Sequence, residues 1–78
     1  MPRYLVKQWT PHRGFTRENP SCYFYGSYIY HHPLTAVRSD MCYTNLKVAQ
    51  RVAEKNCGLY SHTEVIEVPE ELIVKEVI

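Results

Sequence analysis

The sequence predicts a small α+β domain, in which a mainly antiparallel sheet of three to four strands is packed by one amphipathic helix, in the order β-β-α-β-β. Three observations support this prediction. Residues 44–58 have helical periodicity with a start and a stop signal. Several short runs elsewhere are rich in β-branched and aromatic residues. A chain of 78 residues has room for one core, so we expect residues 1–78 to form a single domain of two layers.

The first expected strand is residues 3–9, RYLVKQW, with Leu5 and Val6 on opposite faces. Residues 10–21 follow, and this segment contains two prolines, a glycine and an asparagine. These residues favour turns, which predicts a long irregular loop. Long loops in small domains are often functional, and Arg13 and Arg17 are among the groups that this loop would expose.

Residues 22–31, CYFYGSYIYH, give the strongest strand signal because Tyr, Phe and Ile favour a pleated, half-buried surface. Gly26 interrupts this strand and indicates either a bulge or a close approach by another backbone. Pro33 ends it.

The helix has two possible starts. Asp40 would cap a longer helix, whereas Thr44 or Asn45 would cap a shorter one, and we favour the later start. Gly58 provides the stop signal.

Two further strands are expected near the C-terminus, at residues 63–68 and 72–78. Pro69 separates them, and the two glutamates that follow it suit the start of a single helical turn.

The helix is amphipathic. Its expected apolar face consists of Leu46, Ala49, Val52, Ala53 and Cys57. On the other side, basic residues recur every four positions: Lys47, Arg51 and Lys55. This spacing places the three side chains in a line on one face. We call this line the cationic stripe, and it predicts a partner with negative charge.

The charge of the chain is unevenly distributed, although its net value is only +1. Residues 1–39 contain five basic residues and one acidic residue, whereas residues 40–78 contain four basic and seven acidic residues. Patches of opposite sign are suited to docking on a charged protein or nucleic-acid surface.

Three cysteines, Cys22, Cys42 and Cys57, cannot all pair within one chain. The first residues lack the pattern of a secretory signal, and no apolar run approaches the ~20 residues needed to cross a bilayer. We therefore expect a cytoplasmic protein with reduced thiols.

Metal binding and catalysis have weak support. A zinc site would need Cys22, His31, Cys57 and His62, but these residues lack the close ligand pairs that preorganise such sites. Cys57 and His62 form the only nucleophile and base candidate, and nothing in the sequence orients the base. We expect no metal, no cofactor and no enzymatic activity.

Binding to a protein is the favoured function class, because Tyr, Trp and Arg carry much of the energy of protein interfaces. The chain has seven tyrosines, more aromatic surface than a core of this size buries. The candidate binding residues form two groups. One is the cationic stripe of Lys47, Arg51 and Lys55, and the other combines Arg13 and Arg17 with Tyr23, Tyr25 and Tyr28.

The alternative is a small nucleic-acid-binding regulator. It would stack unpaired bases on the aromatic strand of residues 22–31 and contact phosphates through the basic residues. The oligomeric state is open between a monomer and a homodimer, since a second copy can cover an unpaired strand edge.

The helix also carries a resemblance. Residues 45–57, NLKVAQRVAEKNC, lie between RYLVKQW and HTEVIEV, and this arrangement resembles small phage-encoded accessory proteins of the anti-CRISPR kind. Their helix bears an A-x-R-[IV]-A-like run, matched here by Ala49, Arg51, Val52 and Ala53.

The resemblance covers about a third of the chain. It implies a stoichiometric, non-catalytic inhibitor that docks by charged and aromatic patches on a host nucleoprotein complex, for instance at a nucleic-acid groove of a CRISPR effector. The long loop and the Tyr-rich strand depart from that pattern.

Overall fold

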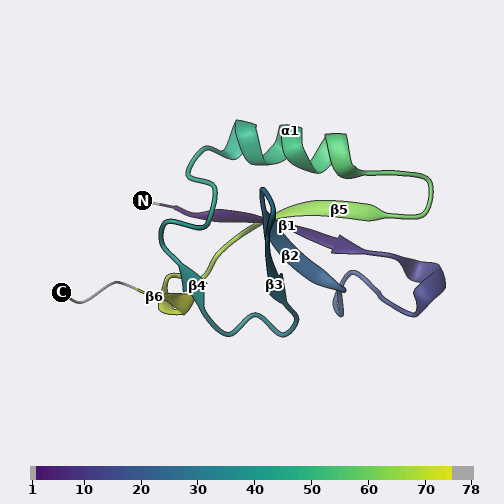
Figure 1. The fold of residues 1–78 in the computed structure, drawn as a ribbon, viewed down its shortest axis with the longest axis horizontal. Helices are drawn as coiled ribbons and strands as arrows, with labels where there is room; N and C mark the ends of the chain where they lie inside the picture. The colour runs from purple at the N-terminus through teal and green to yellow at the C-terminus, as the bar shows by residue number, and fades with distance from the viewer. Residues whose placement is uncertain (1, 75–78) are drawn as a thin grey trace.

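The computed structural model describes residues 2–74 and confirms the α+β class. Figure 1 shows one helix lying over a strongly twisted antiparallel sheet. The sheet has the strand order β3-β2-β1-β5. Its strands are β1 (Tyr4–Trp9), β2 (Cys22–Tyr25), β3 (Tyr28–His31) and β5 (His62–Glu67).

Strand β1 occupies the centre of the sheet and pairs antiparallel with both β2 and β5. Val6 lies opposite Phe24 on one side and opposite Val65 on the other, which places three apolar side chains on one face. Leu5 is on the reverse face, where it lies opposite Ile66. Both Leu5 and Val6 are fully buried, so the central strand has a core on each face of the sheet.

Helix α1 (Leu46–Asn56) covers the Val6 face, where Ala49 and Ala53 pack against Val6 and Phe24. Its side chains there are small, which lets the helix backbone approach the sheet closely. The side chain of Asn45 accepts hydrogen bonds from the amides of Lys47 and Val48, so the later of the two expected helix starts is confirmed.

The helix ends where Cys57 adopts an extended conformation. Gly58 follows directly, as expected for a stop, but without the left-handed backbone that often makes glycine necessary there.

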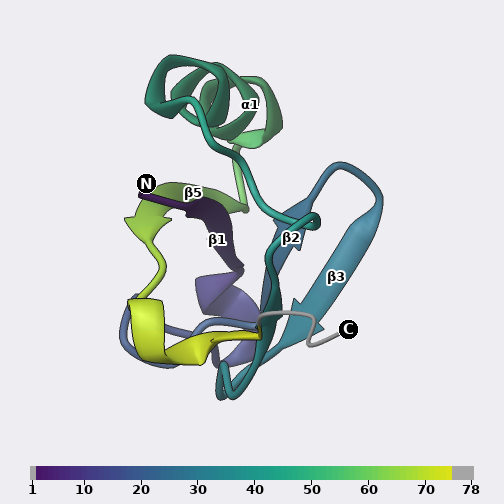
Figure 2. The ribbon, with the colours of Figure 1, turned by 90° about the vertical axis from the view of Figure 1, so that its left-hand side faces the viewer.

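The second face of the sheet is also covered, which differs from the expected two layers. Strands β4 (Val37–Arg38) and β6 (Ile73–Val74) form a short parallel pair. Figure 2 shows this pair on the side of the sheet opposite α1. Val37 is fully buried and packs in one cluster with Leu5, Tyr23 and Tyr30. Adjacent Leu5 and Val6 point to opposite faces and are both fully buried, so each face of β1 needs a cover.

The Tyr-rich segment is a hairpin of two strands, and the prediction of one strand over residues 22–31 was wrong. Tyr25 lies opposite Tyr28, and Gly26 and Ser27 form the turn. Gly26 has a positive φ of 57°, while no other residue type has positive φ in the part of the chain that the structure describes. A glycine with positive φ in the first central position is the requirement of the type II′ turn, which suits the twist of a hairpin.

The remaining predictions agree with the structure to within a few residues. The segment between β1 and β2 is irregular apart from the 3-10 turn η1 (Pro11–Arg13). A second 3-10 turn, η2 (Glu70–Leu72), follows Pro69 as expected. The final strand was expected over residues 72–78. It is present as β6, and residues 75–78 of the expected range lie outside the described residues.

The dependence of the fold on β1 gives a stability prediction. We expect Leu5→Ala to lower the free energy of unfolding by about 2–5 kcal/mol, because a fully buried leucine leaves a cavity. The matched control is Leu59→Ala, whose side chain is 88% exposed and whose effect should stay within about 0.5 kcal/mol. Urea unfolding of both variants measures the difference, and equal effects would contradict the two-faced core.

Candidate docking surface

The outer face of α1 carries the cationic stripe. Lys47, Arg51 and Lys55 are all exposed. None of their side chains forms an ion pair or a hydrogen bond within residues 2–74. Buried Ala49 and Ala53 fix the opposite side of the helix against the sheet, so the stripe points outward.

Helix stability accounts for only part of the stripe. Lys55 lies in the last turn, where the helix dipole favours a cation, and Arg51 has Glu54 at spacing i, i+3. Lys47 to Arg51 and Arg51 to Lys55 are like-charged neighbours at spacing i, i+4, and each such pair destabilises a helix by roughly 0.2–0.5 kcal/mol. Lys47 also lies in the first turn, which contains no acidic residue, and the helix dipole disfavours a cation there. An anionic partner would relieve both effects.

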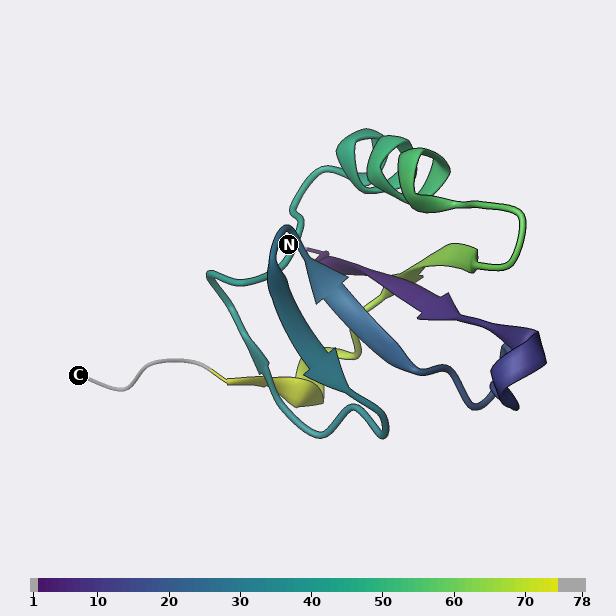
Figure 3. The same ribbon diagram turned by 45° about the vertical axis from the view of Figure 1, so that its right-hand side comes forward.

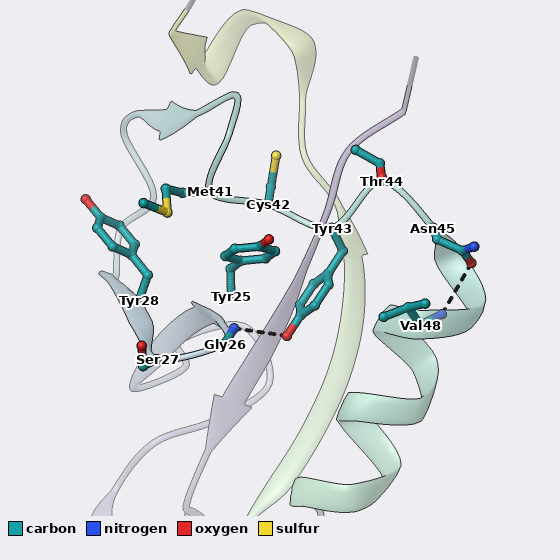
Figure 4. A pocket seen from close by; sticks show the side chains of 10 residues that line it. All are labelled: Tyr25, Gly26, Ser27, Tyr28, Met41, Cys42, Tyr43, Thr44, Asn45 and Val48. Carbon is teal, nitrogen blue, oxygen red and sulfur yellow. Dashed lines mark hydrogen bonds between the residues drawn. The ribbon is translucent and has the colours of Figure 1, made fainter.

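A groove opens beside the start of α1. It has a volume of about 640 Å³ and lies between the β2–β3 turn and the segment that leads into the helix. Figure 3 shows these two parts of the chain side by side. The lining residues, labelled in Figure 4, are Tyr25, Gly26, Ser27, Tyr28, Met41, Cys42, Tyr43, Thr44, Asn45 and Val48.

Hydrogen bonds and ring contacts hold the inner wall of the groove in place. The hydroxyl oxygen of Tyr43 accepts a hydrogen bond of 3.0 Å from the amide of Gly26, and its ring packs on Tyr25 with 4.8 Å between centroids. The backbone of Tyr43 also exchanges two 2.8 Å hydrogen bonds with that of Tyr4, at the start of β1. The wall is therefore attached to the central strand and to the hairpin turn.

The outer wall is formed by exposed apolar side chains. Tyr28 is 38% exposed and Val48 is 40% exposed. The Tyr28 ring packs edge-on against Tyr30, whose hydroxyl donates to the carbonyl of Met41 at 2.9 Å. The hairpin therefore contacts the segment before the helix twice, through Gly26 and Tyr43 at the inner wall and through Tyr30 and Met41 at the outer wall.

The cationic stripe and the groove are neighbours. Val48 lines the groove, and Arg51 follows it at spacing i, i+3, so the two side chains lie side by side on α1. Lys47 stands between Asn45 and Val48, which both line the groove. No acidic residue is among the lining residues named above.

The structure divides the second predicted group of binding residues. Tyr25 and Tyr28 line the groove near the helix start, whereas Arg13 and Arg17 belong to the loop at the far end of β1. Tyr23 is buried in the core, with its hydroxyl 3.1 Å from Nδ1 of His32. Tyr25 and Tyr28 therefore lie near the cationic stripe and far from the two loop arginines.

The loop end has its own interactions. Arg17 Nε lies 2.7 Å from Oε2 of Glu64, and this hydrogen-bonded pair lowers the pKa of the Glu64 carboxyl, with Lys7 adding a smaller effect of the same sign. Nearby, the Trp9 ring stacks on His62 with 5.6 Å between centroids, and Nζ of Lys7 lies 5.4 Å from the Trp9 ring centroid.

Sequence reasoning missed several groove residues. Met41, Tyr43 and Val48 were not among the expected binding residues, although Val48 gave a signal because it is an apolar residue outside the apolar face of the helix. Leu46 and Cys57, expected on the buried face, are exposed, so that the buried face is narrower than predicted.

The candidate metal ligands do not converge. Within residues 2–74, no group of three or more His, Cys, Asp or Glu side chains is placed to hold a metal ion. Cys57 is exposed at the end of α1, and His62 packs against Trp9. None of the helices in that range is long and apolar enough to cross a bilayer.

No protein-family model matches the chain, and no curated protein or solved structure matches it either.

Cys42, at the floor of the groove, and Cys57 give a test of the local geometry. Cys42 is 5% exposed and burial raises the pKa of its thiol, so less thiolate forms near pH 8 and little of it is accessible. We expect iodoacetamide to alkylate exposed Cys57 well before Cys42, as followed by mass spectrometry. Unfolding in urea should remove the difference, and equal rates in the folded protein would contradict this placement.

The Arg17–Glu64 pair gives a prediction about pH. Because the pKa of Glu64 is lowered in the folded state, the contact stabilises the fold above the unfolded carboxyl pKa. That stabilisation disappears as pH falls through the lowered value. We expect Arg17→Met to raise the pKa of Glu64 toward its ordinary range in a carbon-13 NMR titration. Arg13→Met is the control, and an equal rise there would show that general charge, not the contact, sets the pKa.

Proposed function

We propose that this protein is a non-catalytic protein-binding module that docks through the outer face of α1 on an acidic protein surface. The observation that carries the proposal is the cationic stripe, whose three side chains are exposed and form no ion pair or hydrogen bond within residues 2–74. Lys47 in addition lies in the first turn, where the helix dipole disfavours a cation. An exposed line of cations attracts anions and is therefore suited to recognition of an acidic surface.

Charge complementarity restricts the kind of partner. The stripe attracts carboxylates or phosphates, whereas a groove that holds nucleic acid is itself basic and would repel it. Glu70 and Glu71 are exposed on the side of the sheet opposite α1, as Figure 2 shows for η2, so they do not neutralise the stripe. Helix α1 itself carries one acidic residue, Glu54, against the three basic residues of the stripe. We therefore place the target on an acidic subunit face.

The resemblance to phage-encoded accessory proteins adds the biological setting to this proposal. In that setting the protein is a phage or mobile-element inhibitor of the anti-CRISPR kind, acting in the host cytoplasm on a nucleoprotein complex such as a CRISPR effector. Such an inhibitor works by occupying a surface, for which a rigid patch is sufficient.

The alternative, direct binding of nucleic acid by the aromatic strand, has less support. Tyr23 and Tyr30 are buried, and their rings cannot stack on bases without opening the core. Tyr28, which is 38% exposed, remains the accessible ring of β3.

Charge reversal in the stripe tests the proposal. We expect Lys47→Glu/Arg51→Glu to weaken capture of the target from bacterial lysate by at least about tenfold, because attraction becomes repulsion at the centre of the interface. Arg13→Glu/Arg17→Glu is the comparison at the loop end: it makes the same change in net charge and tests the second candidate surface, and it also removes the ion pair between Arg17 and Glu64. Quantitative mass spectrometry of the captured proteins, with and without nuclease, measures the effect.

Each result has a distinct meaning. Loss of capture in the loop variant alone would move the docking surface to the loop, and unchanged capture in both variants would refute both surfaces. If capture depends on intact nucleic acid and falls steeply with salt, the nucleic-acid alternative replaces the proposal. Circular dichroism melting curves confirm that each variant is folded.

A further inference from the structure

The groove between the β2–β3 turn and the start of α1 has the size and lining of a side-chain receptor. Its volume of about 640 Å³ lies within the range of roughly 300–1,000 Å³ that is typical of binding pockets. Three tyrosine rings, Met41 and Val48 supply an apolar lining. Aromatic rings and methionine favour contact with another aromatic ring.

The groove is held open by contacts that do not involve a ligand. Tyr43 is hydrogen-bonded to Gly26 and packed on Tyr25, and Tyr28 is packed on Tyr30. Figure 4 shows the Tyr43 hydroxyl directed at the hairpin turn, where it accepts the hydrogen bond from Gly26. A receptor that is formed in advance binds with a smaller loss of conformational entropy.

The groove also offers polar groups at its rim. The hydroxyls of Tyr25 and Tyr28 have no hydrogen-bond partner within residues 2–74. Each is able to donate to, or accept from, the backbone of an entering peptide. Apolar walls with a few such groups provide affinity together with orientation.

The charge beside the groove selects the sequence around the entering side chain. Arg51 lies beside Val48 at spacing i, i+3, Lys47 precedes Val48 in the first turn of α1, and no carboxylate lines the groove among the residues given for it. An entering segment with acidic residues next to its anchor would place them against these two cations.

We propose that the groove receives an aromatic side chain from an acidic segment of the partner protein. The inference rests on the proposed function, because it assigns to the same partner an anchor that the cationic stripe alone does not provide. The stripe attracts and orients the segment, and the groove buries its ring, a division typical of interfaces with a central hot spot.

Capped pentapeptides and nitrogen-15 NMR of the whole chain test this assignment. The main probe has a central tryptophan with two glutamates on each side. A second peptide has alanine in place of tryptophan, and a third has lysines in place of the glutamates. We expect the first to cause saturable shifts of the Gly26 and Val48 amides, with a Kd on the order of 1 mM, and the other two to bind at least about tenfold more weakly.

Two variants locate the effect. Val48→Glu places a carboxylate in the groove wall and should weaken the main peptide at least about tenfold. Leu46→Glu is the matched control, because Leu46 is 42% exposed against 40% for Val48 and lies on the same helix but does not line the groove. Its affinity for the peptide should stay within about twofold of the wild type.

The outcomes separate this inference from the proposed function. If both acidic peptides bind equally and shift only amides along the cationic stripe, the groove assignment is overturned and the proposed function stands. If the lysine peptide binds as well as the glutamate peptide, the assignment of an acidic partner segment is overturned. Shifts of Gly26 on concentrating the protein alone would instead make the groove a contact between copies of this chain. Absence of any shift with the main peptide overturns the groove assignment. The proposed function is decided independently, by capture of the target from lysate with the Lys47→Glu/Arg51→Glu variant.

Discussion

Strand β1 must bury apolar side chains on both faces of the sheet, and the rest of the molecule is arranged around that constraint. Leu5 and Val6 are adjacent and fully buried, so each face above the central strand needs its own cover. Helix α1 supplies one cover, and the β4–β6 pair with the chain around it supplies the other. The segment between β4 and α1 passes from one layer to the other, and the groove lies along this passage.

The candidate docking surface is a consequence of that arrangement. Ala49 and Ala53 bring α1 close to the sheet, which leaves a narrow buried face and exposes Leu46 and Val48 at its margins. If the buried face of α1 also included Val48, this side chain would pack on the sheet and would no longer line the groove. The same narrow contact keeps the long cationic side chains on solvent-facing positions, where salt and water weaken their mutual repulsion.

Local signals in the sequence were sufficient for the fold class, the helix start and the irregular loop, because caps, turn residues and alternation act over a few residues. The third layer was missed because β4 is a two-residue strand with no periodic pattern to detect, so the strand expected over residues 72–78 had no visible partner on that face. The hairpin was missed although Gly26-Ser27 is a signal for a type II′ turn, because a glycine inside a continuous aromatic run was interpreted as a bulge or a close approach. The groove depends on contacts between Tyr4, Tyr25 and Tyr43, which are distant in sequence, so only the three-dimensional arrangement reveals it.

The pairing of β1 with β5 has a consequence for synthesis of the chain. Leu5 leaves the ribosome well before its partner Ile66, because β2, β3, β4 and α1 lie between them in the chain. Until then the central strand has one edge without a neighbour, and long-range pairing of this kind is slow to form. The nascent protein therefore cannot complete its sheet until β5 has been made, and until then the edge of β1 is open to pairing with another chain.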